Sequence, residues 1–252
     1  MRTRILFACG LTLNTLLASL AVQAASSILI WPINPLIEAD RQKSAALWLE
    51  NRGLEPVDLQ VRVLAWEQKG FEDRLTPQKQ VVGSPPMATL QPGKRQLVRL
   101  VNLEPPGPGA LRSYRVLIDE VLPPQPQPSQ LGVQFQMRYS VPLFVVGPGA
   151  YLDDGAREAP AQGQALAPDL RYRVVEGSDG AFLYLRNIGP APARLSQVNL
   201  LRASGPQSVA PGLLGYVLPD AQMRWPLPNG VRSGQVQARI NEHRKAQTLA
   251  AE

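Results

Sequence analysis

The stretch GVQFQMRYSVPLFVVGP, residues 132–148, carries the clearest strand pattern of the chain. Apolar and polar residues alternate from Val133 to Leu143, which is typical of a half-buried β-strand. The stretch is about twice the usual strand length, and it contains Pro142, which cannot donate a hydrogen bond to a neighbouring strand. We therefore expect an edge strand, although proteins normally shorten or cover such edges because their unpaired groups attract other chains.

Short alternating segments, separated by turn signals, continue on both sides of this stretch. Residues 57–68 alternate cleanly, and Asn51–Gly53 and Gln91–Gly93 have the composition of turns. No segment has the periodicity of an amphipathic helix. This spacing of strands predicts an all-β protein built from β-sandwiches.

A segment rich in Gly, Ala and Pro, residues 145–168, interrupts the strand pattern. The pattern resumes after it in a shorter second half. Segments of this composition commonly separate domains. We therefore predict an N-terminal domain of residues 25–148 and a C-terminal β-sandwich domain of residues 149–252.

The first 24 residues, MRTRILFACGLTLNTLLASLAVQA, predict a secretory signal peptide. They combine two early arginines, an apolar run and a small-residue ending, so cleavage after Ala24 is expected. A transmembrane anchor is the alternative, but polar residues such as Asn14 interrupt the run. Cleavage removes Cys9, the only cysteine, so the mature protein would contain no disulfide. No membrane insertion is expected after cleavage.

The charged residues argue against an enzyme and against nucleic acid as a partner. The formal net charge of +6 falls to about +4 on cleavage, and the basic residues stand singly rather than in runs. The only histidine, His243, lies in a hydrophilic segment, which leaves no general base for a hydrolytic triad. Asp119 and Glu120 point to opposite faces of a predicted strand, and Asp153 and Asp154 lie in a loop predicted to be solvated. We predict no enzyme activity, no metal and no cofactor.

Four segments follow one another in the order typical of one family: LWLENRG (47–53), SPPMATLQPGKRQLVRL (84–100), YRVLIDEVLPP (114–124) and VQFQMRYSVPLFV (133–145). They resemble the periplasmic chaperones of the chaperone–usher pilus pathway, and within it the divergent, archaic branch. The resemblance implies two immunoglobulin-like β-sandwich domains set at an angle, with a cleft between them. Beyond residue 148 the resemblance rests only on length and strand character.

The resemblance implies a function for the long strand of the opening. Chaperones of this family fold and cap a pilus subunit by donating such a strand to the groove left by the subunit's missing strand. They then deliver the subunit to an outer-membrane usher. The side chains that match the groove-filling row are Val133, Phe135 and Met137, with Tyr139 as a fourth. On alternation alone, these side chains fit the core of the chaperone equally well.

The resemblance also implies a cleft that binds the C-terminal carboxylate of the subunit. Two basic residues bind it in the best-known branch, but the matching positions here carry Asn34 and Pro142, which have no positive charge. Arginine suits this task because its guanidinium contacts both carboxylate oxygens. The candidates, on strands expected to border the cleft, are Arg115, Arg138 and Arg99. Each of them is alternatively a solvated strand residue or a partner in an internal ion pair.

Two other protein classes fit parts of the sequence. A secreted β-sandwich module for binding or adhesion usually exposes a cluster of aromatic side chains, whereas the four tryptophans here are scattered along the chain: Trp31, Trp48, Trp66 and Trp225. A pilus subunit would be a single domain. The sequence does not identify the subunit served or the ligand of the pilus, and it leaves open whether the free form self-associates.

Overall fold

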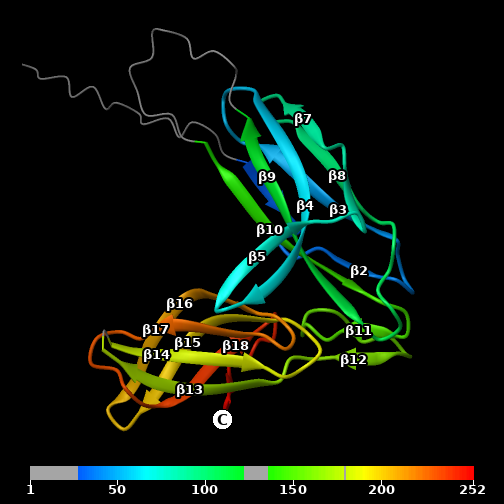
Figure 1. Cartoon of the computed structure of the whole chain (residues 1–252). Helices are drawn as coiled ribbons and strands as arrows, with labels where there is room; N and C mark the ends of the chain where they lie inside the picture. The colour runs from blue at the N-terminus through cyan, green and yellow to red at the C-terminus, as the bar shows by residue number, and fades with distance from the viewer. Residues whose placement is uncertain (1–27, 122–135, 179) are drawn as a thin grey trace, which may run out of the picture.

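The computed structural model describes residues 28–121, 136–178 and 180–252, and their strands form two lobes (Figure 1). The strands of the first lobe, drawn in blue to green, run in a different direction from those of the second, drawn in yellow to red. Every regular element of these ranges is a strand, as the sequence predicts. Within the same ranges, no helix is long and apolar enough to cross a membrane.

Two sheets packed face to face form the first lobe. The first, called here the β3 sheet, has the order β1 (Ile28–Trp31), β3 (Ser44–Asn51), β8 (Arg95–Asn102) and β6 (Val81–Ser84). The second, called the β10 sheet, has the order β2 (Leu36–Glu38), β10 (Arg138–Val146), β9 (Leu111–Val121), β4 (Val57–Lys69) and β5 (Glu72–Pro77), and β7 (Met87–Leu90) also pairs with β4.

The core of the first lobe is built from alternate side chains of both sheets. Leu47 and Leu49 of β3 are fully buried, and so are Val116 and Ile118 of β9 in the opposite sheet. The residues between them in sequence face outward, because successive side chains of a strand point to opposite faces. The alternation seen in the sequence is therefore the signature of this sandwich.

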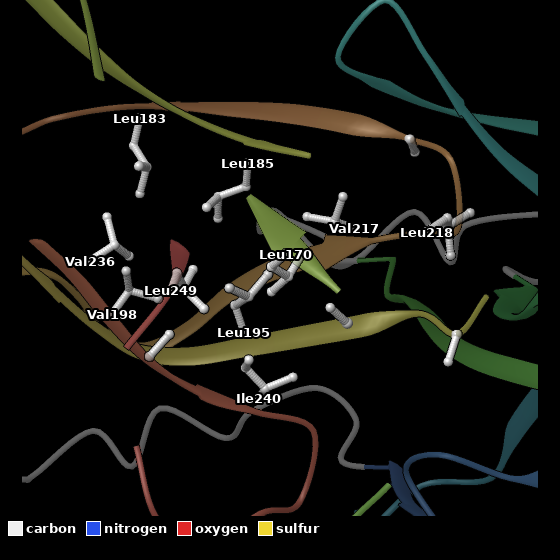
Figure 2. Packing of buried hydrophobic residues seen from close by; sticks show 14 of the residues in the cluster. Leu170, Leu183, Leu185, Leu195, Val198, Val217, Leu218, Val236, Ile240 and Leu249 are labelled. Atoms are coloured by element: carbon white, nitrogen blue, oxygen red, sulfur yellow. The ribbon is translucent and has the colours of Figure 1, made fainter. Parts of the chain in front are cut away.

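The second lobe is also a sandwich of two sheets. One has the order β17 (Gln222–Pro226), β14 (Gly180–Asn187), β13 (Leu170–Gly177) and β20 (Ala250–Ala251). The other has the order β16 (Gly205–Val217), β15 (Ala193–Arg202), β18 (Gln235–Ile240) and β19 (Gln247–Thr248). Figure 2 shows buried side chains of both sheets, such as Leu183, Leu185, Leu195 and Val236, gathered between them. A short parallel pair, β11 (Ala150–Leu152) and β12 (Gln164–Leu166), precedes this sandwich.

The same Asn-x-Gly turn ends a strand in each lobe. Asn51 accepts the N–H of Gly53 (2.8 Å) while its amide donates to the carbonyl oxygen of Leu90 (3.0 Å). Asn187 accepts the N–H of Gly189 (3.0 Å) in the same way, and its amide donates to two further carbonyl oxygens. Both side chains are fully buried. Where the chain turns, these hydrogen bonds take the place of the main-chain hydrogen bonds between neighbouring strands.

Apolar contacts join the two lobes, although each sheet of the described chain lies within one lobe. The core of the second lobe continues into the first through four buried residues: Leu36, Trp66, Phe144 and Val146. The chain passes from the first lobe to the second between β10 and β11. The domain limits at residues 24, 148 and 149 remain predictions.

Candidate functional site

The edge of β10 that faces away from β9 is paired at one end only. There β2 runs parallel to it, opposite Phe144 to Val146. The N–H of Phe144 donates to the carbonyl oxygen of Pro35 (3.4 Å), and the carbonyl of Val146 accepts the N–H of Ala39 (3.0 Å). Both main-chain groups of a residue in an antiparallel strand point the same way, and alternate residues share this direction. The even-numbered residues of β10 therefore direct their main-chain groups outward.

Ahead of Phe144, the outward main-chain groups belong to Arg138, Ser140 and Pro142. No strand of the described chain pairs with them. Pro142 lacks an N–H, so its place on this outer edge removes no hydrogen bond from the ladder with β9. The expected edge strand is confirmed from Arg138 to Pro142, whereas β2 covers Phe144 to Val146. We call the stretch from Arg138 to Pro142 the open edge.

The groove-filling row predicted from the sequence continues the core-facing row of β10: Val141, Leu143 and Val145. Tyr139 is half-buried against this core, and its hydroxyl donates to the carboxylate of Glu120 (3.3 Å). Met137 lies two residues further out and is 43% exposed. Val133 and Phe135 lie outside the described residues. The row thus leaves the core of the first lobe between Tyr139 and Met137.

Arg138 belongs to an ion cluster on the outward face of the β10 sheet. It pairs with Asp119, to which the guanidinium of Arg62 also donates (2.7 Å). Burial alone raises the pKa of Asp119, but the hydrogen bonds from Arg138 and Arg62 outweigh burial and lower this pKa below its usual range. Glu120 faces the core instead, as the sequence predicts for adjacent strand residues. Arg138 is therefore already engaged by a carboxylate.

Arg115 lies on the same outward face, where β9 pairs with Pro142 on one side and with Leu64 on the other. Its guanidinium carbon lies 3.7 Å from the ring centre of Trp66 in the first lobe. The ring centre of Tyr216, in the second lobe, lies 5.2 Å away. The side chain of Arg115 is 13% exposed. It thus lies between an aromatic ring of the first lobe and one of the second.

The guanidinium of Arg115 is buried without a close anionic partner. Burial lowers its pKa, although the negative charge of Asp73 acts in the opposite direction. The Asp73 carboxylate lies 3.7 Å from Arg115, too far for a good hydrogen bond, and no other described carboxylate forms an ion pair with it. A guanidinium has five N–H donors. Arg115 is therefore a cation with unused donors, in a position to bind an anion.

A small cavity of about 30 Å³ lies between the lobes, and Tyr216 is one of its lining residues. Asn34 of the first lobe lines it together with Arg157 and Arg194 of the second. The amide nitrogen of Asn241, which also lines the cavity, is buried without a hydrogen-bond partner in the described chain. This volume is large enough for a water molecule. Asn34 stands at the position where the best-known branch has its first basic residue. It therefore shares a cavity with two arginines of the second lobe.

Both of these arginines have carboxylate partners of their own. Arg157 pairs with Asp154, and Arg194 lies 3.4 Å from Glu242. Asp154 is 5% exposed and accepts the main-chain N–H of Ala156 (3.0 Å), so the expectation that it is solvated is wrong. Within the described ranges, no group of three His, Cys, Asp or Glu residues is placed to hold a metal ion.

Arg99 does not border the cleft, which corrects the expectation from the sequence. It lies on β8 in the β3 sheet, opposite Ala46 on one side and Ser84 on the other. Its neighbours Val98 and Leu100 face the core, so Arg99 points away from the sandwich on the side opposite to the open edge. The sequence pattern gives the face of a strand correctly but not the sheet to which the strand belongs.

The tryptophans are less scattered in space than in the sequence. Trp31 and Trp48 are register partners on β1 and β3, and their rings stack at 6.1 Å with an interplanar angle of 13°. Both are half-buried on the outward face of the β3 sheet, and Arg95 lies over Trp31 at 5.3 Å. This pair therefore lies on a different sheet from the open edge.

Comparison with known proteins agrees with this geometry. The family model described as "Pili and flagellar-assembly chaperone, PapD N-terminal domain" matches residues 35–149. The chain is 30% identical to the chaperone in the CsuC–CsuE chaperone–tip adhesion subunit pre-assembly complex, from the archaic chaperone-usher Csu pili of Acinetobacter baumannii. That match covers 90% of this chain and 99% of the other, with a TM-score of 0.69. No curated protein sequence matches the chain.

Two more distant structures share the fold alone. The Salmonella enterica SafB chaperone, solved with the SafA pilin, is 17% identical, with a TM-score of 0.59 over 89% of this chain and 96% of its own. The E. coli chaperone DraB is 19% identical, with a TM-score of 0.58 over 90% of this chain and 98% of its own. The chain belongs to the family of pilus chaperones of the chaperone–usher type, with two immunoglobulin-like domains. Its role is that of a chaperone in pilus assembly.

Proposed function

We propose that this chaperone captures a pilus subunit by strand addition at the open edge. The observation that carries the proposal is that the outward edge of β10, on the side away from β9, has no partner strand in the described chain from Arg138 to Pro142 and is covered by β2 from Phe144. A strand of the subunit pairs with the open edge through main-chain hydrogen bonds, and alternate side chains of the chaperone set the register. The side chains that enter the subunit are those of the row Val133, Phe135, Met137 and, at its inner end, Tyr139.

The end of the open edge also determines where a subunit strand must stop. A subunit strand that runs parallel to β10 meets β2 at Phe144, so its last residue lies beside Pro142. Arg115 is the register partner of Pro142 on the next strand. An unpaired buried carboxylate is costly, and Arg115 offers a guanidinium without a close partner. We therefore assign the terminal carboxylate of the subunit to Arg115 rather than to Arg138 or Arg99.

We infer the compartment and the second partner from the predicted signal peptide and from the family. Cleavage of the signal peptide after Ala24 releases the mature chaperone into the periplasm, where an outer-membrane usher receives the loaded subunit. The proposal includes neither catalysis nor a cofactor. A secreted product whose N-terminus is still Met1 would contradict the cleavage.

Ser140→Pro tests the open edge without altering the ladder of β10 with β9. The variant loses one outward N–H, and proline is tolerated on this edge, as Pro142 shows. One main-chain hydrogen bond contributes about 1 kcal/mol, so capture of a subunit that the wild type binds is expected to weaken roughly fivefold. The measurement is a competition in which differently tagged wild type and variant share one co-expressed subunit.

Ser140→Ala is the matched control, because it removes the same hydroxyl but keeps the N–H. It is expected to capture the subunit as the wild type does. Equal capture by Ser140→Pro, with thermal unfolding unchanged, would mean that the open edge carries no subunit strand.

A further inference from the structure

The hairpin of β4 and β5 reaches from the first lobe to the second (Figure 1). Its two turn residues, Gly70 and Phe71, have φ angles of 65° and 67°. Two successive positive φ angles are typical of a type I′ hairpin turn, whose preferred residues are Asn, Asp and Gly. A phenylalanine in this conformation is uncommon and strained. The turn itself gains nothing from the aromatic side chain.

The ring of Phe71 is placed on the outward face of the second lobe. It meets the ring of Tyr184 on β14 edge to face, with centroids 5.4 Å apart and an interplanar angle of 85°. The guanidinium of Arg224, on β17, lies over Phe71 at 4.9 Å and over Phe182 at 5.4 Å. Arg173, on β13, lies over Tyr184 at 4.6 Å. Edge-to-face and cation–π contacts of this kind are attractive.

A second contact from the same hairpin lies three residues earlier. The side-chain amide of Gln68 donates to the carbonyl oxygen of Tyr216 (3.0 Å) and accepts the N–H of Leu218 (2.8 Å). One side chain therefore bonds to the main chain of the second lobe on both sides of Val217. This main chain carries the Tyr216 ring that stands beside Arg115.

We propose that the β4–β5 hairpin is a strut that sets the position of the second lobe, with Phe71 and Gln68 as its positioning residues. Domains joined by a modest interface move relative to each other by default. Phe71 keeps a strained backbone conformation while its ring contacts belong to the other lobe, which is expected if the side chain acts between the lobes. That the strut also sets the place of Tyr216 beside Arg115 for binding of the subunit rests on the proposed function, whereas the positioning of the lobes does not.

Phe71→Gly tests the role of the strut without destabilising the hairpin itself. Glycine suits a positive φ better than phenylalanine, so the turn is retained or improved while every ring contact with the second lobe is lost. Leu54→Cys and Ala203→Cys, at exposed positions in turns of the two lobes, can carry spin labels, since the predicted mature chain lacks cysteine. Electron–electron double resonance then gives the distribution of distances between the lobes in the free chaperone.

Phe71→Gly is expected to broaden this distribution, at least about twofold in width, while amide exchange along β4 stays as slow as in the wild type. Phe71→Tyr keeps the ring and is expected to give the wild-type distribution. An unchanged distribution in Phe71→Gly would overturn the proposal, and so would equal broadening in Phe71→Gly and Phe71→Tyr. Because no subunit is present, the result is independent of whether subunits bind at the open edge.

Discussion

Arg115→Ala is expected to weaken subunit capture by about 3 to 5 kcal/mol, that is, a hundredfold or more, because it leaves a buried carboxylate without a partner. The position of Arg115 carries this expectation: it neighbours Pro142, where the open edge ends, and it is 13% exposed. Its guanidinium is engaged by an aromatic ring at 3.7 Å and only loosely by Asp73. Competition for a co-expressed subunit measures the loss.

Arg138→Ala and Arg99→Ala are the matched controls for this prediction. Arg138 already pairs with Asp119, and Arg99 lies in the other sheet, so both variants are expected to retain most of the capture. Arg115→Ala also removes the contact with Trp66, so thermal unfolding must be compared. One additional residue at the C-terminus of the subunit displaces the carboxylate without changing the chaperone and is expected to reproduce the loss. Capture that is insensitive to both changes would exclude Arg115 as the anchor.

Met137→Asp and Phe135→Asp are each expected to abolish subunit capture while the chaperone remains folded. Burying Val133, Phe135 and Met137 in the subunit contributes roughly 4 to 9 kcal/mol before ordering costs, and a charged residue in that groove would be unpaired. Met137 is 43% exposed in the free chain, so its replacement removes little of the chaperone's own core. Capture is measured by co-purification, and the fold by thermal unfolding.

Leu54→Asp is the matched control, since Leu54 is an apolar residue, 71% exposed, away from the open edge. It is expected to change neither capture nor unfolding. Should Met137→Asp instead lower the unfolding temperature sharply, the side chain belongs to the core of the chaperone. Replacement of Tyr139 by Asp is expected to lower the unfolding temperature to some extent, because Tyr139 is half-buried against the core and its hydroxyl donates to Glu120.

The edge strand was predictable from the sequence because its signals are local. Alternation gives the face of each side chain, and Pro142 marks the edge, since proline cannot donate to a ladder. The sequence also gives Asn34 and Pro142 as departures from the cation pair that the resemblance implies. The face of each side chain and the edge need only neighbouring residues, whereas the departures at Asn34 and Pro142 rest on the resemblance.

The surroundings of Arg115 were not predictable, because they depend on pairing between distant segments. Trp66, Asp73 and Tyr216 lie far from Arg115 in the chain, and only the sheet order and the junction of the lobes bring them together. The same limit explains why Arg99 was expected beside the cleft. Alternation predicts the face of the strand on which Arg99 lies, but not the sheet to which that strand belongs. The contact of Phe71 with the second lobe has only one indication in the sequence. This indication is a bulky residue at a position where a hairpin turn favours Asn or Gly.

The main-chain amides of β10 test the central claim most directly. In the free chaperone the N–H groups of Arg138 and Ser140 point outward and are expected to exchange rapidly with solvent. Those of Tyr139 and Val141 face β9 and are expected to exchange slowly. Hydrogen exchange resolved by residue, compared between the free chaperone and its complex with a subunit, should show Arg138 and Ser140 becoming protected. If both amides still exchange rapidly in a complex that has formed, the subunit does not add a strand at the open edge.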